Sequence, residues 1–289
     1  MKQLTIISGK GGTGKTTIAS NFIKLAHDHI AVDTDVDAAN LHILLKPEIE
    51  VKKDFIGGAV AKVNDDCINC GKCQELCRFD AISDSTVKIK IDPLKCEGCG
   101  VCEYICPTGA ITLVKEKQGQ FYTSNTSFCK LIHARLNPGA ENSGLLVTTI
   151  RNIAEDIAYA ENKKLIIIDG APGIGCPVIA SLNGVDFALI VTEPTLSGIS
   201  DFKKIYDVAK FFNIKMFACI NKFDINLSNT AEIEKFCTQN NISLIGKISY
   251  DENVPKLLSQ KKFIIDSPQN PAAKDIIKLW ENFDKIIYE

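Results

Sequence analysis

The sequence lacks an excess of charge of either sign, and it lacks long apolar runs. Its 33 Lys and Arg against 35 Asp and Glu leave a net charge of −2, so no basic field is available for nucleic acid or anionic membrane. No run reaches the roughly 18 apolar residues of a membrane span, and the apolar run Leu4–Ser8 is too short for a signal peptide. We therefore expect a cytoplasmic protein with no membrane span and no nucleic-acid partner.

The overall amino-acid composition indicates a folded chain that is rich in cysteine. With 289 residues, 45% of them hydrophobic, the sequence is long enough for one large domain or two ordinary ones. Twelve cysteines are unusual, and eight of them fall between Cys67 and Cys106. A secreted disulfide scaffold does not suit a long chain without an export signal, so the grouped thiols indicate metal binding.

Short apolar runs alternate with helical patterns along most of the chain. Such runs, buried on both faces, indicate an α/β fold with a parallel sheet covered by helices. The predicted strands are Leu4–Ser8, Ile30–Asp33, Leu165–Asp169, Phe187–Thr192, Lys215–Ile220 and Ser243–Ile248. The predicted helices include Lys15–His27, Ser200–Phe212, Thr230–Asn240 and a C-terminal amphipathic helix with Ile276, Trp280 and Phe283 on the face expected to pack against the core.

One crossover, between the strands ending at Asp33 and Asp169, is too long for an ordinary βα unit. It contains the cysteine-rich segment, which we interpret as a small α+β domain at residues 59–115 inserted into a larger domain. The larger domain would comprise residues 1–58 and 116–289. The polar stretch Phe128–Gly144 is expected to be irregular, either as an ordinary surface loop or as a surface through which the two domains communicate.

A glycine-rich loop joins the first strand to the first helix. It contains the GxxxxGKT pattern in the strand–loop–helix context that this pattern requires. The glycines let successive N–H groups face a polyphosphate, and the helix N-terminus adds a partial positive charge. Lys15 is expected to reach the β- and γ-phosphates, and Thr16 to bind Mg²⁺. The predicted nucleotide-binding residues in this loop are Gly9, Lys10, Gly11, Gly12, Thr13, Gly14, Lys15, Thr16 and Thr17.

With Lys10, the loop resembles the deviant Walker A motif of the MinD/ParA/Mrp superfamily of P-loop ATPases. In that family the first lysine crosses a dimer interface to the phosphate bound by the partner subunit. The resemblance therefore implies ATP hydrolysis by a homodimer, or by a heterodimer with a paralogue, in which Lys10 and Lys15 are catalytic.

Other residues match the same family one at a time. The segment Asp33–Leu41 resembles switch I, in which Asp35 would orient the attacking water and Asp33 would lie near Mg²⁺. Asp169 ends a strand, resembles the Walker B aspartate and would hold Mg²⁺ through water. Asn221, in an Asn-Lys-Phe-Asp sequence, resembles the purine-binding residue. Because GTPases share that sequence, guanine stays open as an alternative to adenine, although Lys10 favours ATP.

The inserted segment contains an internal repeat. The pattern C-x2-C-x2-C-x3-C begins at Cys67 and recurs 29 residues later at Cys96. The first three cysteines of each pattern can wrap one [4Fe–4S] cluster, while the fourth ligates the other cluster. The expected ligands are Cys67, Cys70, Cys73 and Cys106 for cluster 1, and Cys96, Cys99, Cys102 and Cys77 for cluster 2. Zinc is the structural alternative, because CxxC pairs also form zinc sites.

The repeat resembles a bacterial two-cluster ferredoxin, and the whole chain resembles MinD-superfamily ATPases that carry an inserted ferredoxin domain. That resemblance implies a nucleotide switch coupled to electron transfer, with an unidentified redox or cluster-acceptor partner. One alternative is an Mrp-like iron–sulfur cluster assembly or carrier ATPase. Another is a redox-sensing regulatory or positioning ATPase of ParA/MinD type.

Cys176 bears on the choice between these functions. It lies seven residues after Asp169, where the nitrogenase iron protein has a cysteine that ligates a cluster shared across the dimer. An extra cluster at Cys176 would favour the carrier function, with Cys129 as a candidate for a further ligand. The opposing interpretation is a small buried residue at the start of a helix.

Overall fold

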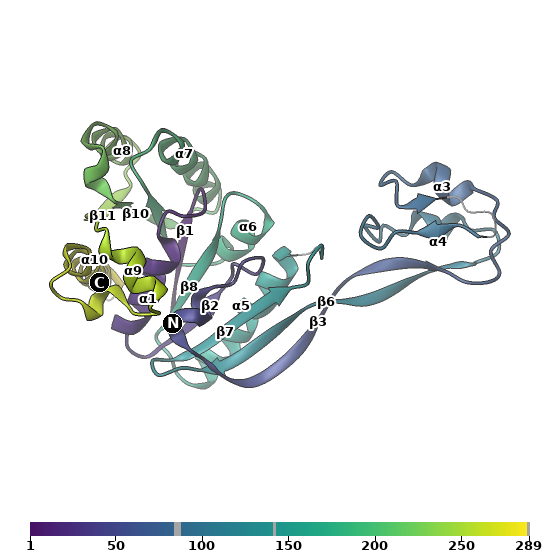
Figure 1. The fold of residues 1–289 in the computed structure, drawn as a ribbon, viewed down its shortest axis with the longest axis horizontal. Helices are drawn as coiled ribbons and strands as arrows, with labels where there is room; N and C mark the ends of the chain where they lie inside the picture. Colours follow the sequence, from purple (N-terminus) through teal and green to yellow (C-terminus); the bar gives the residue numbers. More distant parts are fainter. Residues whose placement is uncertain (84–87, 141–142, 288–289) are drawn as a thin grey trace. The chain divides into compact units, whose positions relative to one another are not determined.

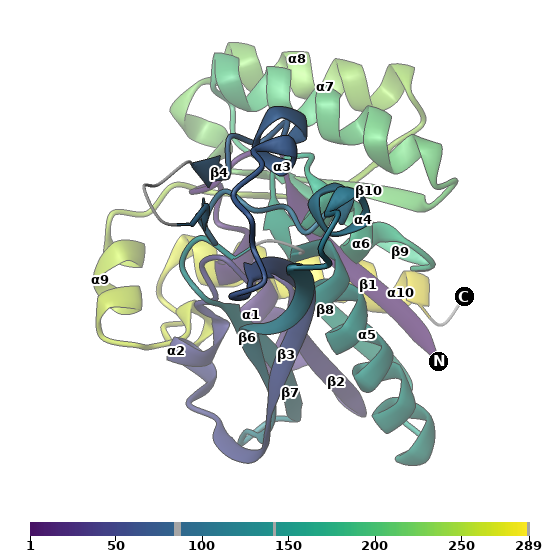
Figure 2. The same ribbon diagram turned by 90° about the vertical axis from the view of Figure 1, so that its right-hand side faces the viewer.

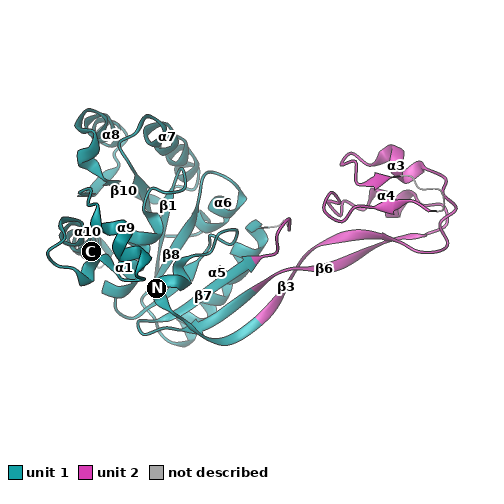
Figure 3. Cartoon of the chain, viewed as in Figure 1, with its two compact units in different colours: residues 1–52, 121–135, 143–289 teal, residues 53–120, 136–142 magenta. Residues whose placement is uncertain are grey.

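The computed structural model describes residues 1–83, 88–140 and 143–287 of the chain. It divides into two compact units, drawn in different colours in Figure 3. Unit 1 comprises residues 1–52, 121–135 and 143–289, and unit 2 comprises residues 53–120 and 136–142. Within the described ranges, no helix combines the length and the apolar character that crossing a membrane requires.

Unit 1 is built around a parallel sheet (Figure 1). Its parallel strands are β1 (Lys2–Ser8), β2 (His29–Asp33), β7 (Lys130–Leu136), β8 (Leu165–Pro172), β9 (Phe187–Thr192), β10 (Lys215–Asn221) and β11 (Ser243–Ile248), in the order β11-β10-β9-β1-β8-β2-β7. All six strands expected from apolar runs are present. The carboxyl ends of parallel strands meet at one edge, so the side chains at Ser8, Asp33 and Asp169 are brought together there.

Helices cover both faces of the sheet (Figures 1 and 2). Alternate residues of β1 point to opposite faces: Leu4 and Ile6 join the core cluster formed by α1 and α10, whereas Thr5 donates from Oγ1 to the carbonyl oxygen of Ser181 in α6, at 2.7 Å. The helices of unit 1 are α1 (Lys15–Leu25), α2 (Leu41–Leu45), α5 (Ser143–Ala160), α6 (Cys176–Leu182), α7 (Leu196–Phe211), α8 (Leu227–Gln239), α9 (Asn253–Ser259) and α10 (Pro271–Ile287).

The C-terminal helix α10 docks on the core, as its amphipathic pattern predicts. Phe283 is fully buried, and its ring lies 6.3 Å from Phe22 of α1 and 5.8 Å from Phe217 of β10. Trp280 packs edge-on against Phe22 with ring centroids 5.0 Å apart. These aromatic contacts attach the end of the chain to both α1 and the sheet.

Some local expectations differ from the structure, including the end of α1 at Leu25 and the start of α8 at Leu227. The stretch Phe128–Gly144 is not irregular throughout, because Lys130–Leu136 forms the buried strand β7 beside β2. Helix α7 begins at Leu196, four residues before the predicted start, because Thr195 caps it by accepting a hydrogen bond at Oγ1 from the backbone N–H of Gly198.

Two long strands carry the chain from unit 1 into unit 2 and back. They are β3 (Glu48–Val63) and β6 (Ile111–Asn125), which lie next to each other and follow β7 in the sheet order (Figure 1). The expected boundaries at residues 59 and 115 therefore fall inside continuous strands, and the compact unit itself begins at residue 53 and its first segment ends at residue 120.

Unit 2 repeats one backbone motif at the spacing of the cysteine repeat. Helices α3 (Lys72–Leu76) and α4 (Val101–Ile105) occupy equivalent positions, and each follows a glycine in the left-handed region, Gly71 at φ 73° and Gly100 at φ 81°. Left-handed backbone recurs at Asn69 and Gly98, again 29 residues apart. A short antiparallel pair, β4 (Ile82–Ser83) and β5 (Lys90–Ile91), completes the unit. The sequence repeat is therefore a structural repeat.

Candidate functional site

The glycine-rich loop is fitted closely to Asn221 at the end of β10. Gly12 and Gly14 have φ of 82° and 92°, a conformation that favours glycine. The Asn221 side-chain amide donates from Nδ2 to the carbonyl oxygen of Thr13 at 2.7 Å. A Cβ at Gly14 would stand 2.3 Å from the same Nδ2. The structure thus joins the phosphate loop to the residue expected to face the base.

Lys15 forms a buried ion pair with Asp169. Their Nζ and Oδ1 atoms are 2.7 Å apart, and Lys15 also donates to Oγ1 of Thr16 at 3.3 Å. Asp169 is fully buried, and its second carboxylate oxygen, Oδ2, has no hydrogen-bond partner among the described residues. Lys15 therefore contacts both Asp169 and the Thr16 hydroxyl, and the unpartnered carboxylate oxygen and this hydroxyl are the kind of oxygen donors that Mg²⁺ prefers.

Asp33 and Asp35 stand beside this pair, at the end of β2. Both oxygens of Asp33 accept backbone hydrogen bonds, Oδ1 from Asp35 and Oδ2 from Leu41, each at 3.1 Å. Complete burial and the nearby charge of Asp169 raise the pKa of the Asp33 carboxyl to about 7. Burial also raises the pKa of the half-buried Asp35. The site therefore concentrates carboxylates that a cation would stabilise.

Lys10 is held within its own chain by Glu193. Lys10 Nζ lies 2.7 Å from Oε1 of Glu193 and donates to Oγ of Ser197 at 2.8 Å, while Lys222 approaches the other Glu193 oxygen at 3.2 Å. Partial burial acts to raise the pKa of Glu193, but the two lysines outweigh it and the pKa lies below its usual value. Sequence reasoning did not identify Glu193 as a site residue. The available signal was its position directly after β9, at the same edge of the sheet.

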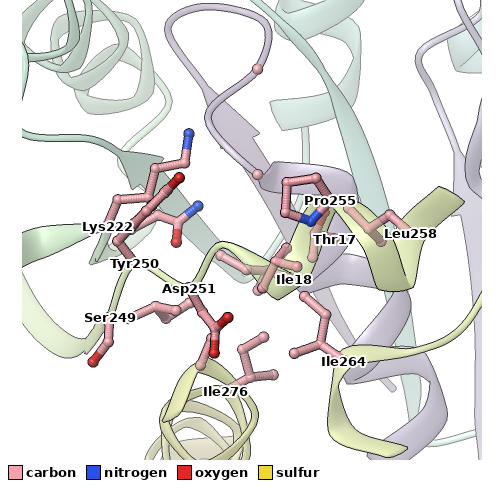
Figure 4. A pocket seen from close by; sticks show the side chains of 16 residues that line it. Thr17, Ile18, Lys222, Ser249, Tyr250, Asp251, Pro255, Leu258, Ile264 and Ile276 are labelled. Carbon is pink, nitrogen blue, oxygen red and sulfur yellow. The ribbon is translucent and has the colours of Figure 1, made fainter. Parts of the chain in front are cut away.

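A cavity of about 220 Å³ lies beside the phosphate loop (Figure 4). Gly12, Gly14 and Asn221 line one side, and the segment Ser249–Asp251 lines another. The remaining wall is largely apolar and consists of Ile18, Ile248, Val254, Pro255, Leu258, Ile264, Ala272 and Ile276, together with the polar residues Thr17 and Lys222. A largely apolar cavity of this volume beside the loop suits a purine ring attached to phosphates in the loop.

Asp224, the last residue of the Asn-Lys-Phe-Asp sequence, does not line this cavity. Its Oδ1 accepts a hydrogen bond from the backbone N–H of Tyr250 at 2.8 Å. The carboxylate therefore organises the loop after β11 and is not directed at a base in the cavity.

The eight grouped cysteines line two cavities in unit 2. One is lined by Cys67, Cys70, Cys73 and Cys106, and the other by Cys77, Cys96, Cys99 and Cys102 together with Cys73. Because Cys73 borders both, the two cavities adjoin. Backbone N–H groups of Ala61 and Ala110 donate to the sulfurs of Cys96 and Cys106, at 3.4 and 3.2 Å. Within the described residues, no three His, Cys, Asp or Glu side chains converge on a single metal-ion position.

Cys176 is exposed at the first residue of α6, and three residues separate it from the end of β8 at Pro172. It is therefore not the small buried residue of the alternative interpretation. Cys129 precedes β7, so it lies at the opposite edge of the sheet from Cys176. Burial raises the pKa of the Cys129 thiol to about 12, and the two cysteines do not share a site within one chain.

The sequence profile of the CbiA family, described as the CobQ/CobB/MinD/ParA nucleotide binding domain, matches residues 4–264. The chain belongs to this family. As a CbiA-family ATPase of MinD/ParA type, it binds and hydrolyses ATP. It is also 35% identical over 288 residues to an uncharacterized protein of Methanocaldococcus jannaschii, MJ0578, covering 99% of this chain and 97% of that protein.

Two further similarities cover very different shares of this ATPase. The crystal structure of the cell division ATPase MinD of Pyrococcus furiosus superimposes with a TM-score of 0.60 at 18% identity, covering 99% of each chain, and shows the common fold. A stretch of 53 residues is 43% identical to one component of the Na⁺-translocating ferredoxin:NAD⁺ oxidoreductase complex of Acetobacterium woodii. That stretch covers 18% of this chain and 16% of the component.

Proposed function

We propose that this ATPase couples a nucleotide-driven switch to electron transfer through two [4Fe–4S] clusters held by unit 2. The observation that carries the proposal is the pair of adjoining cavities, each bordered by the four cysteines of one expected cluster. The similarity to a component of a ferredoxin-linked oxidoreductase complex also supports the proposal.

The fit of unit 2 to such clusters rests on its own residues. Its apolar core, which includes Ala61, Ile82 and Ile111, packs against Cys67, Cys77, Cys96, Cys102 and Cys106. N–H groups directed at sulfur, as at Cys96 and Cys106, stabilise a negatively charged thiolate and tune the potential of a cluster bound to it. When bound, the clusters would supply one-electron transfer at low potential.

The nucleotide half uses the residues at the carboxyl edge of the sheet. Lys15 and the loop N–H groups would bind the β- and γ-phosphates, and Thr16, Asp33 and Asp169 would hold Mg²⁺ directly or through water. Asp35 would orient the attacking water. Lys15 would have to exchange its contact with Asp169 for phosphate, which frees that carboxylate for the cation.

Lys10 would complete the site of a partner subunit. In the single chain it is paired with Glu193, so crossing the interface requires it to leave this carboxylate for the partner's phosphate. A homodimer, or a heterodimer with a paralogue, would then close only when nucleotide is bound. Hydrolysis would remove the γ-phosphate and return both lysines to carboxylates.

Anaerobic purification with iron analysis tests the cluster proposal. The wild-type chain is expected to hold about eight iron atoms, reducible by dithionite. Cys70→Ser and Cys99→Ser should each lose about half of the iron, because each removes a ligand of one cluster only. Cys237→Ala is the control, since Cys237 is buried in α8 of unit 1 and should leave the iron content unchanged. Zinc in place of iron would contradict the proposal.

A cluster-carrier function is a second candidate, favoured by the exposed position of Cys176. A carrier would hold additional labile iron at this residue. Comparison of iron bound before and after chelator treatment in wild type and Cys176→Ser separates the two functions. Electron transfer predicts equal, chelator-resistant iron in both proteins, whereas a carrier predicts a labile fraction that the substitution removes.

A further inference from the structure

A stack of three rings connects switch I to the strand that leads into unit 2. The Tyr122 ring in β6 lies 4.9 Å from the His133 ring in β7, with 20° between their planes. The His133 ring in turn lies 6.1 Å from the His42 ring in α2, with 15° between planes. These three residues come from different elements of unit 1. The part of β6 that precedes Tyr122 in the sequence belongs to unit 2 up to residue 120.

Two backbone connections link the stack to Asp33, a residue of the proposed Mg²⁺ site. His133 is the strand partner of Asp33, because β2 and β7 pair in parallel with these two residues in register. The second oxygen of Asp33 accepts the N–H of Leu41, the first residue of α2, and His42 is the next residue. A change in the position of the Asp33 carboxylate therefore acts directly on the start of the helix that carries His42.

The central ring is fixed more firmly than the outer ones. His133 is 8% exposed, and its Nε2 lies 3.1 Å from Oγ of Ser124, which is fully buried in β6. Tyr122 is half-buried and His42 is exposed on a helix of five residues. A short helix with one exposed ring can shift as a unit, whereas a buried ring held between two strands transmits the shift.

We propose that His42, His133 and Tyr122 form the path through which a conformational change in switch I is transmitted to β6 and from there to unit 2. The inference rests on the proposed role of Asp33 beside Mg²⁺. When nucleotide and cation bind, the cation attracts the Asp33 carboxylate, and its contact with the Leu41 N–H changes. Helix α2 then moves, and the ring stack passes this movement to Tyr122. The rings act by packing, so their stacking and not their protonation carries the signal.

Hydrogen–deuterium exchange tests this path without depending on the clusters. In wild type, a slowly hydrolysed ATP analogue with Mg²⁺ should slow amide exchange by about threefold or more in Asp33–Leu45 and also in Phe121–Asn125. In His133→Ala the first change should persist and the second should disappear. His133→Phe keeps a stacked ring without the Ser124 contact and should retain most of the second change. Tyr122→Leu, at a half-buried position, should lose it.

Phe128→Leu is the matched control. Phe128 packs edge-on against Phe263 at 5.3 Å near the amino end of β7, away from the stack, so this variant should behave as wild type. Slowed exchange of Phe121–Asn125 in His133→Ala, equal loss in the Ala and Phe variants, or no nucleotide effect on β6 in wild type would each overturn the path. None of these results concerns iron content, so failure of the path is distinguishable from failure of the proposed function.

Discussion

Lys15 and Asp169 form an ion pair in the interior of the molecule, with 2.7 Å between Nζ and Oδ1 and 6% and 0% of the two side chains exposed. A charge buried this deeply depends on its partner, because water cannot replace it. The pair links the phosphate loop to β8, and the same two groups are the ones that nucleotide and Mg²⁺ would separate.

Removing Lys15 should therefore affect both stability and activity. Lys15→Ala leaves Asp169 buried beside Asp33, and we expect the free energy of unfolding without nucleotide to fall by about 3 kcal/mol. ATP hydrolysis should fall more than about 100-fold. Urea unfolding and phosphate release measure the two effects. Lys278→Ala removes an exposed pair with Glu281 and is the control, expected to cost less than about 1 kcal/mol.

Removing the Glu193 carboxylate should favour the dimer. In Glu193→Gln, Lys10 no longer gives up an ion pair to reach a partner, so the ATP-dependent dimer dissociation constant should fall about fivefold. Sedimentation at saturating Mg·ATP measures it. Glu232→Gln breaks an exposed pair with Lys203 and should leave the constant unchanged. An unaltered dimer in Glu193→Gln would show that this contact does not restrain Lys10.

Asp224 should not select the base. Its Oδ1 accepts from the backbone of Tyr250, and Asn can accept the same bond, so Asp224→Asn should keep the preference for ATP over GTP within about twofold. A carboxylate that contacted the base would change this ratio about tenfold or more. Competition binding of the two nucleotides decides between the outcomes. Asn221→Ala, which loses the bond to Thr13, should weaken binding of both nucleotides.

His29 should make the fold sensitive to acid. Burial, followed by the charge of Lys163, lowers its pKa from 6.5 to about 4. The unfolded chain takes up this proton below pH 6.5 and the folded chain does not, so stability is lost as the pH falls from 6.5 to 4. The contribution of His29 to this loss is about 3 kcal/mol. Urea unfolding at several pH values should show a correspondingly weaker dependence in His29→Leu; equal slopes would contradict the assignment.

The parts of the fold that the sequence predicts are those set by local pattern. The apolar runs that form β1, β8 and β9 are buried on both faces, and their nearly continuous apolar composition indicates this burial. Strand β7 was missed because His133 and Arg135 interrupt its apolar run. Its burial depends on pairing with β2, which a local pattern does not contain. The same holds for β3 and β6, whose pairing joins segments on either side of the cysteines.

The candidate site likewise has features that a sequence motif predicts and contacts that it does not. The phosphate loop and the cysteine repeat have fixed spacings that reveal their chemistry, and the structure brings Lys15, Asp33 and Asp169 to one edge as strand order requires. The contact of Lys10 with Glu193 and the stack of Tyr122, His133 and His42 join residues distant in sequence. Such contacts have no periodicity or motif, so only the folded chain shows them.

The most direct test of the central claim is the midpoint potential of the clusters in anaerobically purified protein, measured by EPR-monitored titration with and without Mg·ATP. Coupling of about 1–3 kcal/mol between the nucleotide switch and unit 2 predicts a shift of about 40–130 mV. Mg·ADP should give a smaller shift, and Lys15→Ala none. An intact two-cluster protein whose potential is the same with ATP, with ADP and without nucleotide would contradict the account.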